Sequence, residues 1–488
     1  MLTLINANSM RPLVAPIGLD YVAGAARAAG VEADVLDLAL AADAAAALRR
    51  HFESAKPRLV GITFRNASDC FWPSAEWFVP ALADLVRTVR TLTDAPIVLG
   101  GVGFSIFAER TMERTGADFG IRGDGEQAIV ALARQVAGRR RFDAAAGLIW
   151  RSGGRLISNP PAWDEPLAVP TARDAIDNAV YFRLGGQGSV ETKRGCDRAC
   201  AYCADPIAKG PRVRRRDPAA VADEVAALHR QGVDVLHLAD SEFNVPRDHA
   251  MAVCEELIRR SLGDRVRWYT YMAVVPFDAT LAGAMRRAGC VGINFTGDSA
   301  ADAILVAYGQ PHRAADIEAA VSHCHASGMA VMIDLLLGGP GETPVTVAET
   351  IGLLKRIGPD CVGASLGVQI CPGTAIEEMV RAMGPLESLP GIRRRYAGPV
   401  DLAQPTFYIS PALGGRPAAL VCDLIGGDRR FFEPAEEGPD LAPSGPGEAA
   451  GGDKGYNYND NTPIVEAIRR GERGAYWDIL RRMRIATG

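Results

Sequence analysis

Cys196, Cys200 and Cys203 are the residues of this chain whose types and spacing most directly indicate chemistry. They follow the pattern C-x3-C-x2-C, directly after a strand-like run at 188–192. Thiolates are soft ligands that select zinc and iron–sulfur clusters. A compact loop of this kind can direct three thiolates to three corners of a [4Fe–4S] cube, which leaves one iron open for another ligand.

A zinc knuckle and plain packing of buried cysteines are two other interpretations of the same loop. Structural zinc normally takes four ligands. The nearest other candidates, His229, His237 and Cys254, fall inside helix-like or strand-like segments and not in a second knuckle. The aromatic Tyr202 before the last cysteine, and the strand before the first, favour the iron–sulfur interpretation.

Residues 1–140, ahead of the loop, predict an α/β domain with a doubly wound parallel sheet. Strand-like runs alternate with helix-like runs, and they fall at 2–6, 31–36, 58–63, 96–99 and 117–121. Ligands of such sheets bind beyond the carboxyl ends of the strands, where glycines let the backbone approach. The candidate residues at this rim are Thr63, Arg65, Asn66, Gly100, Gly101, Gly103, Gly125 and Glu126.

A second series of strand and helix units is expected from 188 to about 385, after a connector at 141–187 with a hairpin at 147–157. Six units predict a partial (βα)6 relative of the (βα)8 barrel, whose active site gathers at the carboxyl ends of the strands. The candidate residues at those ends are Asp240, Glu242, Thr296, Asp298, Asp334 and Gly339.

The cysteine loop, with Tyr202 beside its last cysteine, resembles the signature of the radical S-adenosylmethionine (SAM) superfamily, in which the open iron chelates SAM. An α/β domain directly ahead of it resembles the cobalamin-binding domain of the cobalamin-dependent radical SAM family. The resemblance spans 1–385. It implies a Rossmann-like cobalamin-binding domain, a partial TIM-like barrel, and three cofactors: a [4Fe–4S] cluster, SAM and cobalamin.

The resemblance implies roles for residues at the barrel strand ends. Asp240 and Glu242 lie where the SAM ammonium would approach the cluster, and they are the candidate catalytic residues. Thr296 and Asp298 could reach ribose hydroxyls. Helix capping is the plainer role for all four side chains.

Two further positions are assigned to the adenine of SAM. Tyr202 is expected to stack on its ring, and the backbone at Gly339 is expected to pair with its edge. The alternative for the glycine segment 338–341 is a sharp turn only.

The first domain departs from many cobalamin proteins because it lacks the pattern Asp-x-His-x-x-Gly, and His51 is its one histidine. Cobalamin is therefore expected with its own base detached and with no histidine ligand. The candidates for covering its lower face are Arg65 and Asn66. A cation there would disfavour axial ligation and make a methyl group on the upper face easier to transfer.

The function that the resemblance implies is methyl transfer from SAM, through methylcobalamin, to a carbon of a natural-product precursor. A tryptophan-methylating subgroup is similar in outline, and Glu242 near the open iron would suit it. One alternative keeps the cofactors but performs a ring contraction or cyclisation. Another is a non-catalytic or cobalamin-free iron–sulfur protein. The expected partners are a small-molecule substrate and an electron donor such as flavodoxin or ferredoxin.

The composition describes a globular chain of two or three domains. Its 488 residues exceed the usual size of one core. The net charge of -5 gives no general reason to expect nucleic acid. No apolar run reaches membrane-spanning length, so no membrane partner is expected. The N-terminus lacks a secretory pattern, so a cytoplasmic location is expected.

The one basic cluster, 212–216, is either a solvated connection or charge compensation near the cysteine loop.

The C-terminal region, 386–488, is predicted to contain a disordered link at 433–454 that is rich in Pro, Gly, Glu and Ala. An amphipathic helix is expected from about Ile464 onward, with Tyr476 and Trp477 on its path. It could dock over the barrel mouth or pack as an ordinary helix.

Overall fold

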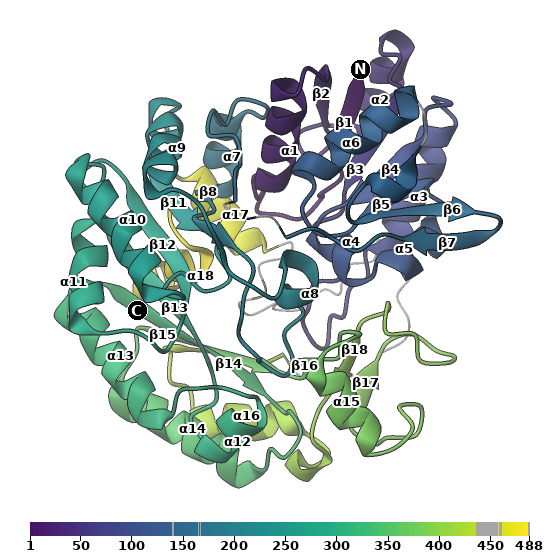
Figure 1. Ribbon diagram of the computed structural model, residues 1–488. Coiled ribbons are helices and arrows are strands. Elements are labelled where there is room, and N and C mark those ends of the chain that lie inside the picture. The colour runs from purple at the N-terminus through teal and green to yellow at the C-terminus, as the bar shows by residue number, and fades with distance from the viewer. Residues whose placement is uncertain (139–140, 164, 166, 436–456, 458–460, 487–488) are drawn as a thin grey trace.

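The computed structural model describes residues 1–138, 141–163, 165, 167–435, 457 and 461–486 (Figure 1). Residues 436–454 of the predicted link lie outside this part of the chain. Two large sheets are present, one in each half of the sequence, and they lie in two lobes that share an interface.

The first sheet carries the strands predicted for residues 1–140. Its order is β2-β1-β3-β4-β5-β6-β7, and its parallel strands are β1 (Leu2–Asn6), β2 (Ala33–Asp37), β3 (Leu59–Thr63), β4 (Ile97–Gly100) and β5 (Phe119–Ile121). Alternate side chains enter separate cores: Leu4 packs among residues of α1 and α6, whereas Ile5 packs among residues of α2 and α3. The helices are α1 (Ile17–Ala28), α2 (Ala44–Ser54), α3 (Val79–Arg90), α4 (Val102–Ile106), α5 (Ala108–Thr115) and α6 (Glu126–Ala137). The doubly wound arrangement is confirmed.

The hairpin expected in the connector belongs to this first sheet. Strands β6 (Leu148–Ser152) and β7 (Arg155–Ser158) continue the sheet antiparallel from β5. Leu148 and Ile149 are buried in the cores on opposite faces of the sheet. An isolated hairpin cannot bury such residues by itself, so the sheet edge recruits it.

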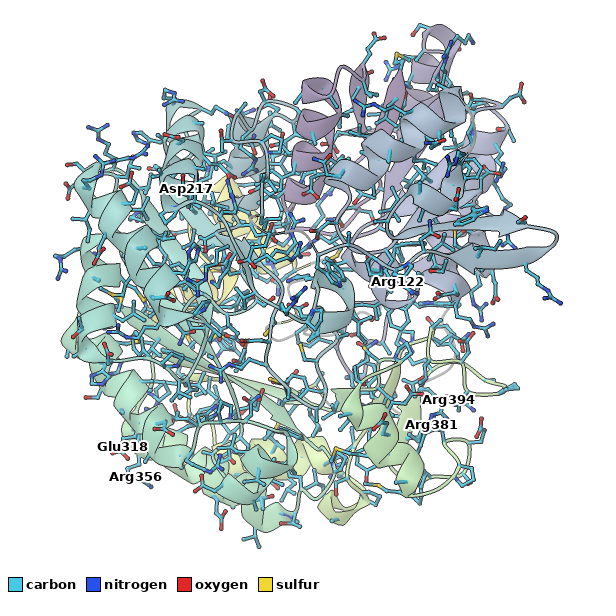
Figure 2. All side chains as sticks on the ribbon, in the orientation of Figure 1. Arg122, Asp217, Glu318, Arg356, Arg381 and Arg394 are labelled. Carbon is cyan, nitrogen blue, oxygen red and sulfur yellow. The ribbon has the colours of Figure 1, made fainter. Side chains whose placement is uncertain are left out.

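The second sheet has the predicted parallel strands and one more. Its order is β19-β15-β14-β13-β12-β11-β8, with β8 (Gly188–Val190), β11 (Val235–Leu238), β12 (Arg267–Ala273), β13 (Cys290–Asp298), β14 (Ala330–Leu337), β15 (Cys361–Leu366) and β19 (Phe431–Phe432). Helices cover its outer face (Figure 1): α9 (Pro218–Arg230), α10 (Arg247–Arg259), α11 (Ala279–Arg287), α13 (Ala314–Ala326), α14 (Pro344–Ile357) and α16 (Pro417–Ile425). Glu318 and Arg356, exposed on α13 and α14, mark the polar outer surface of this layer (Figure 2).

Shorter elements complete the chain and lie around the two sheets. The helices are α7 (Asn178–Gly185), α8 (Asp205–Lys209), α12 (Asp302–Ala307) and α15 (Ala375–Ala382). The strands β16 (Val368–Gln369), β17 (Ile392–Arg394) and β18 (Thr406–Tyr408) form a small antiparallel sheet. None of the helices in the described part of the chain is both long and apolar enough to cross a membrane.

The predicted C-terminal helix is in fact two helices, α17 (Thr462–Arg469) and α18 (Tyr476–Ala486). The chain bends between them at Gly471 and Gly474, which have φ angles of 105° and 144°. Tyr269 donates a hydrogen bond to Asp478 at 2.8 Å. Its neighbour Trp268 points to the outer helices, where it bonds the carbonyl after α11, so Tyr269 points to the inner face. Helix α18 therefore packs inside the open barrel, near the strands' amino ends, and does not cover the mouth.

A buried ionic network joins the two lobes. Arg173 bonds Asp20 of α1 at 2.6 Å and Glu224 of α9 at 2.7 Å. Arg216 pairs with Glu224 at 2.6 Å, and Tyr21 donates to the same carboxylate at 2.8 Å. Because these charges are buried and paired, the network fixes α1 against α9.

Candidate active site

The three cysteines lie on one loop at the carboxyl ends of the barrel strands, between β9 (Lys193–Arg194) and β10 (Arg214–Arg215). Cys196 is buried, and Cys200 and Cys203 are half-buried. The Cys203 amide donates to the Cys200 carbonyl at 3.1 Å, which makes the loop compact. Burial raises the pKa of the Cys200 thiol to about 12.

Tyr202 and Asp298 connect this loop to the end of β13. The Tyr202 hydroxyl donates to both carboxylate oxygens of Asp298, at 2.7 and 2.8 Å. Gln310 donates to the same carboxylate and to the sulfur of Cys200 at 3.3 Å. Burial raises the pKa of Asp298 to about 6. These contacts bring two predicted SAM residues against the second cysteine.

Glu242 lies near Cys196 and Cys200, where burial and then the charge of Glu242 raise the pKa of both thiols. One of its two carboxylate oxygens is bonded within the chain. Thr296 donates to Glu242 Oε1 at 3.0 Å. Glu242 Oε2 is buried and has no partner among the residues that the structure describes. Burial raises the pKa of Glu242 to about 8.

Asp334 and Asn294 form a similar pair on the inner face of β13 and β14. Asn294 donates to Asp334 Oδ2 at 2.7 Å. Asp334 Oδ1 and Asn294 Oδ1 are buried without a partner within the described ranges, and burial raises the pKa of Asp334 to about 7. Buried acceptors normally find a donor. A ligand that carries an ammonium group and hydroxyls, as SAM does, would supply the donors that Asp334, Asn294 and Glu242 lack.

Asp240 does not fit the predicted role at the SAM ammonium. Its carboxylate accepts hydrogen bonds from the Thr192 backbone at 2.7 Å, from the Thr192 hydroxyl and from the Lys193 ammonium at 2.7 Å. Burial alone would raise the pKa of Asp240, but Lys193 and these hydrogen bonds hold it below its usual value. Because protein donors engage both oxygens, Asp240 holds the strand that enters the cysteine loop.

Gly339 is a glycine because of its neighbour Tyr308. A Cβ built at Gly339 would lie 2.0 Å from the Tyr308 hydroxyl, which itself donates to the Leu336 carbonyl at 3.0 Å. The absence of a side chain at Gly339 therefore makes room for Tyr308. An adenine contact by its backbone stays a prediction.

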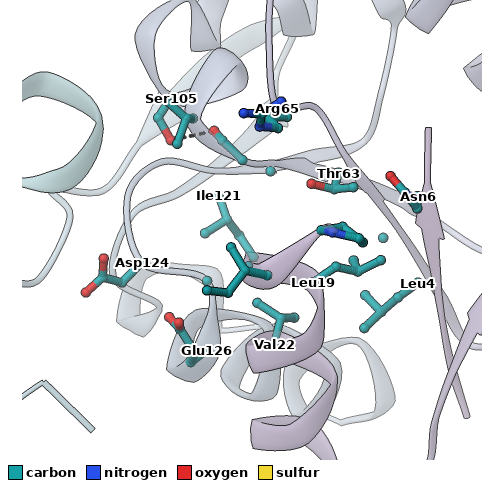
Figure 3. Close-up of a pocket in the computed structure, with 18 of the residues that line it drawn as sticks. Leu4, Asn6, Leu19, Val22, Thr63, Arg65, Ser105, Ile121, Asp124 and Glu126 are labelled. Atoms are coloured by element: carbon teal, nitrogen blue, oxygen red, sulfur yellow. Dashed lines mark hydrogen bonds between the residues drawn. The ribbon is translucent and has the colours of Figure 1, made fainter. Parts of the chain in front are cut away.

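A cavity of about 340 Å³ opens at the carboxyl ends of the first sheet's strands (Figure 3). This size lies in the range of cofactor sites. The predicted rim residues that line it are Thr63, Arg65, Gly100, Gly101, Gly125 and Glu126. Asn66 and Gly103 were predicted with them, but they are not among the lining residues.

Gly101, in the wall of the cavity, and Gly103, behind it, let the loop after β3 pass close to α4. Gly101 has a φ of 109°, and a Cβ there would lie 2.6 Å from the Phe64 carbonyl oxygen. The Gly103 amide donates to the Arg65 carbonyl at 2.8 Å. These contacts fix the backbone of Arg65 and direct its side chain into the cavity. The Arg65 side chain is exposed where it lines the cavity.

Comparisons with known proteins agree with this two-part arrangement. Residues 4–133 match the B12 binding domain and residues 190–354 match the Radical SAM superfamily. The chain is 31% identical over 467 residues to tryptophan 2-C-methyltransferase of Streptomyces laurentii, an alignment that covers 82% of this chain and 78% of that protein. The chain belongs to the family of cobalamin-dependent radical SAM methyltransferases.

A solved methyltransferase structure shares the whole fold. The methyltransferase TsrM from Kitasatospora setae, with tryptophan and a SAM analogue bound, superposes with a TM-score of 0.87 at 29% identity and covers 100% of this chain and 99% of that one. The cobalamin-dependent SAM radical enzyme OxsB has a TM-score of 0.71 at 16% identity, with 84% of this chain and 64% of that one covered, and this similarity concerns the fold.

Membership of this methyltransferase family decides between the functions considered from the sequence. The chain is a radical SAM methyltransferase whose cofactors are a [4Fe–4S] cluster, SAM and cobalamin. The ring-contraction alternative and the non-catalytic alternative are not supported.

Four polar residues that the sequence did not single out line the cavity of the first domain from the barrel side. They are Ser189, Glu191, Arg194 and Lys209. Arg194 and Lys209 lie on either side of the cysteine motif in the sequence. This position was the one signal that could have marked them as residues of the site. The basic cluster at 212–216 contributes buried ion pairs through Arg214 and Arg216, so those two residues are not part of a solvated connection.

Proposed function

We propose that this methyltransferase acts on an aromatic ring carbon of tryptophan or of a tryptophan-like indole. The observation that carries the proposal is the 31% identity to tryptophan 2-C-methyltransferase over most of both chains. The fold likeness to a tryptophan-bound structure across the full length supports it. The cofactors supply the methyl group and its carrier, while the protein supplies placement and electrostatics.

Cys196, Cys200 and Cys203 would hold the cluster in this proposal. Glu242, positioned by Thr296, would face the open iron and the SAM ammonium. The support is that its buried Oε2 has no partner among the described residues and that its charge acts on the thiols of Cys196 and Cys200. A ligand donor at that oxygen would remove the cost of leaving it unpaired.

The remaining contacts to SAM are assigned to three side chains. Tyr202 would lie against the adenine, and Asp298 and Asp334 would accept hydrogen bonds from the ribose. The open acceptor on Asp334 supports its part of the proposal. Asp298 is already paired with Tyr202 and Gln310, so it would exchange one of these bonds for the ribose hydroxyl.

Cobalamin is proposed to bind in the cavity with its base detached and no histidine ligand. His51 bonds Thr3 at 3.0 Å and is not among the residues that line the cavity. Arg65 is therefore the side chain proposed to cover the lower face. A guanidinium has no lone pair to donate to cobalt, so it would disfavour axial ligation.

The proposal also includes a cytoplasmic location and a one-electron donor such as flavodoxin or ferredoxin. All ten cysteines are free thiols in the structure. Free thiols are usual in a reducing compartment, where iron ligands stay available.

The test is an anaerobic assay with reconstituted enzyme, hydroxocobalamin, a reductant, tryptophan and SAM whose methyl group is fully deuterated. We expect a methyltryptophan in which the new methyl group is bonded to a ring carbon and keeps all three deuteriums. An enzyme that binds all three cofactors but leaves tryptophan and simple indoles unmethylated would overturn the substrate proposal while leaving the family assignment intact.

A further inference from the structure

The cysteine loop is closed at its base by a two-stranded ribbon that carries an arginine on each strand. Arg194 of β9 pairs in register with Arg214 of β10. Both guanidiniums reach Asp124, which lies in the turn between β5 and α6. The two ends of the loop thus meet one carboxylate from the other lobe.

Arg194 contacts three carboxylates at once. It lies 2.9 Å and 3.2 Å from the two oxygens of Glu126, 3.0 Å from Asp124 and 2.8 Å from Glu191. The Arg194 and Glu126 side chains are only 10% and 7% exposed. Ion pairs with this bidentate geometry and this burial hold a defined orientation, unlike exposed pairs.

Two of these partners, Asp124 and Glu126, stand on the turn 123–126, which lines the cavity (Figure 3). Arg194 lines the same cavity. Ser105 holds the turn by accepting from the Gly123 amide at 3.0 Å. Glu126 was predicted as a cofactor ligand, yet both its oxygens bond Arg194. The side chain therefore acts first as a tether between the turn and the cysteine loop.

Trp163 packs against the contact between the cysteine loop and the turn 123–126, which we call the joint. Arg214 lies over its ring, with 5.0 Å from the guanidinium carbon to the ring centroid. A Cβ at Gly123 or at Gly210 would lie within 2.9 Å of that ring. The turn, the end of the cysteine loop and the indole are therefore in close contact, and the joint has little room to shift.

We propose that Arg194 and Arg214 are positioning residues that hold the cysteine loop in one register against the turn 123–126, and so set the placement of the cluster relative to cobalamin. The inference rests on the cofactor placement proposed above. Methyl transfer needs a short, defined approach between reacting groups, and a small misplacement lowers the rate strongly. Cys196 is only two residues after Arg194, so its position depends directly on where Arg194 is held against the turn of the cobalamin-binding domain.

The first test uses protein without cofactors. Hydrogen exchange is measured in the segments 195–213 and 123–126 of wild type, Arg194→Lys and Glu126→Gln. We expect both segments to exchange faster in each variant, because a tether protects both of its ends. Wild-type exchange in both segments would overturn the proposal. Glu126→Gln keeps the size of the side chain, so it serves if Arg194→Lys folds poorly.

The second test measures cofactor geometry. In reconstituted protein, pulsed EPR reports how strongly the reduced cluster speeds the relaxation of the cob(II)alamin spin, an effect that depends on their distance. Arg194→Lys is expected to keep its iron and cobalamin but to change this enhancement. Its methyl-transfer kcat is expected to fall by about tenfold to a hundredfold, with the KM for SAM changed by less than about twofold. Unchanged relaxation and kcat would contradict the assignment.

Asp20→Asn is the matched control, since Asp20 pairs with Arg173, makes no hydrogen bond or ion pair with Arg194 or Arg214 within the described residues and does not line the cavity. We expect lower thermal stability but unchanged spin relaxation. An equal change in the control would show that any loosened interface has this effect, and would overturn a specific role for Arg194. Neither the exchange nor the relaxation measurement uses tryptophan, so a wrong substrate proposal would leave both intact.

Discussion

The hydroxyl of Thr296 donates a hydrogen bond to Glu242 at 3.0 Å, and it leaves the second oxygen of that buried carboxylate without a partner in the described chain. These two residues come from the ends of different barrel strands. Glu242 also lies close enough to Cys196 and Cys200 that its charge adds to burial in raising the pKa of both thiols, and the proposed function assigns SAM to this place. Glu242 and Thr296 are therefore treated as one unit in the predictions below.

Removing the Thr296 hydroxyl is expected to weaken SAM binding through Glu242. In Thr296→Val the shape of the side chain is kept, but Glu242 loses the donor that orients it. We expect the Kd for SAM to rise about tenfold, which corresponds to about 1.4 kcal/mol, while the iron content is unchanged. Equilibrium binding to the reconstituted protein measures this. Thr88→Val is the control, because Thr88 is exposed on α3 and bonds only a backbone carbonyl of its own helix.

The stability of the protein without cofactors is expected to fall with rising pH through Asp334. Burial raises its pKa to about 7, whereas an unfolded aspartate titrates near 3.9. Between these values the unfolded chain has released a proton that the folded chain still holds, so stability falls as pH rises. Asp334→Asn should flatten this slope and be about 1–3 kcal/mol more stable at pH 8. Denaturant unfolding from pH 4 to pH 8 provides the check, and equal slopes for the two proteins would refute it.

Replacing Arg65 is expected to change the environment of the cobalt. In Arg65→Met the cation is lost, and water or another ligand can approach the lower face. We expect a shifted visible absorption spectrum of bound cobalamin and about tenfold slower methyl transfer, about 1.4 kcal/mol in the barrier. Arg65→Lys should retain part of the activity because the charge remains. A spectrum of Arg65→Met identical to wild type would show that Arg65 does not face the cobalt.

Gly101 is expected to tolerate no side chain. Gly101→Ala would place a Cβ 2.6 Å from the Phe64 carbonyl oxygen at a φ of 109°, at a cost of about 1–3 kcal/mol. The loop that holds Arg65 should shift as well, so cobalamin affinity should fall. Gly352→Ala is the control, because that glycine lies within α14 with open space around it, and the change should stabilise the protein by up to about 1 kcal/mol. Thermal unfolding and cobalamin titration compare the two.

Local patterns in the sequence were sufficient to predict the cysteine loop, the two series of strands and most of the rim of the cavity. The cysteine spacing and the strand ends are properties of neighbouring residues, so they can be read without the fold. The glycine turns were also found, although Gly101 and Gly103 serve mainly the close packing of the loop after β3 against α4.

Relationships between distant residues could not be predicted in the same way. Asp240 is engaged by Thr192, 48 positions away, and Arg194 pairs with Glu126, 68 positions away. Tyr269 and Asp478 are 209 positions apart, and their contact places α18 inside the barrel. A carboxylate at a strand end has the same local pattern whether a ligand or a lysine is its partner, and only the packing decides between them.

The most direct test of the central claim is absorption and EPR spectroscopy of anaerobically reconstituted protein, with and without hydroxocobalamin and SAM, on wild type and Cys200→Ala. We expect a [4Fe–4S] signal that shifts when SAM is added, together with retained base-off cobalamin. Cys200→Ala should lose the cluster signal. Full iron content in Cys200→Ala would contradict this assignment. So would a cluster signal that does not change on addition of SAM, in a protein that does not retain cobalamin.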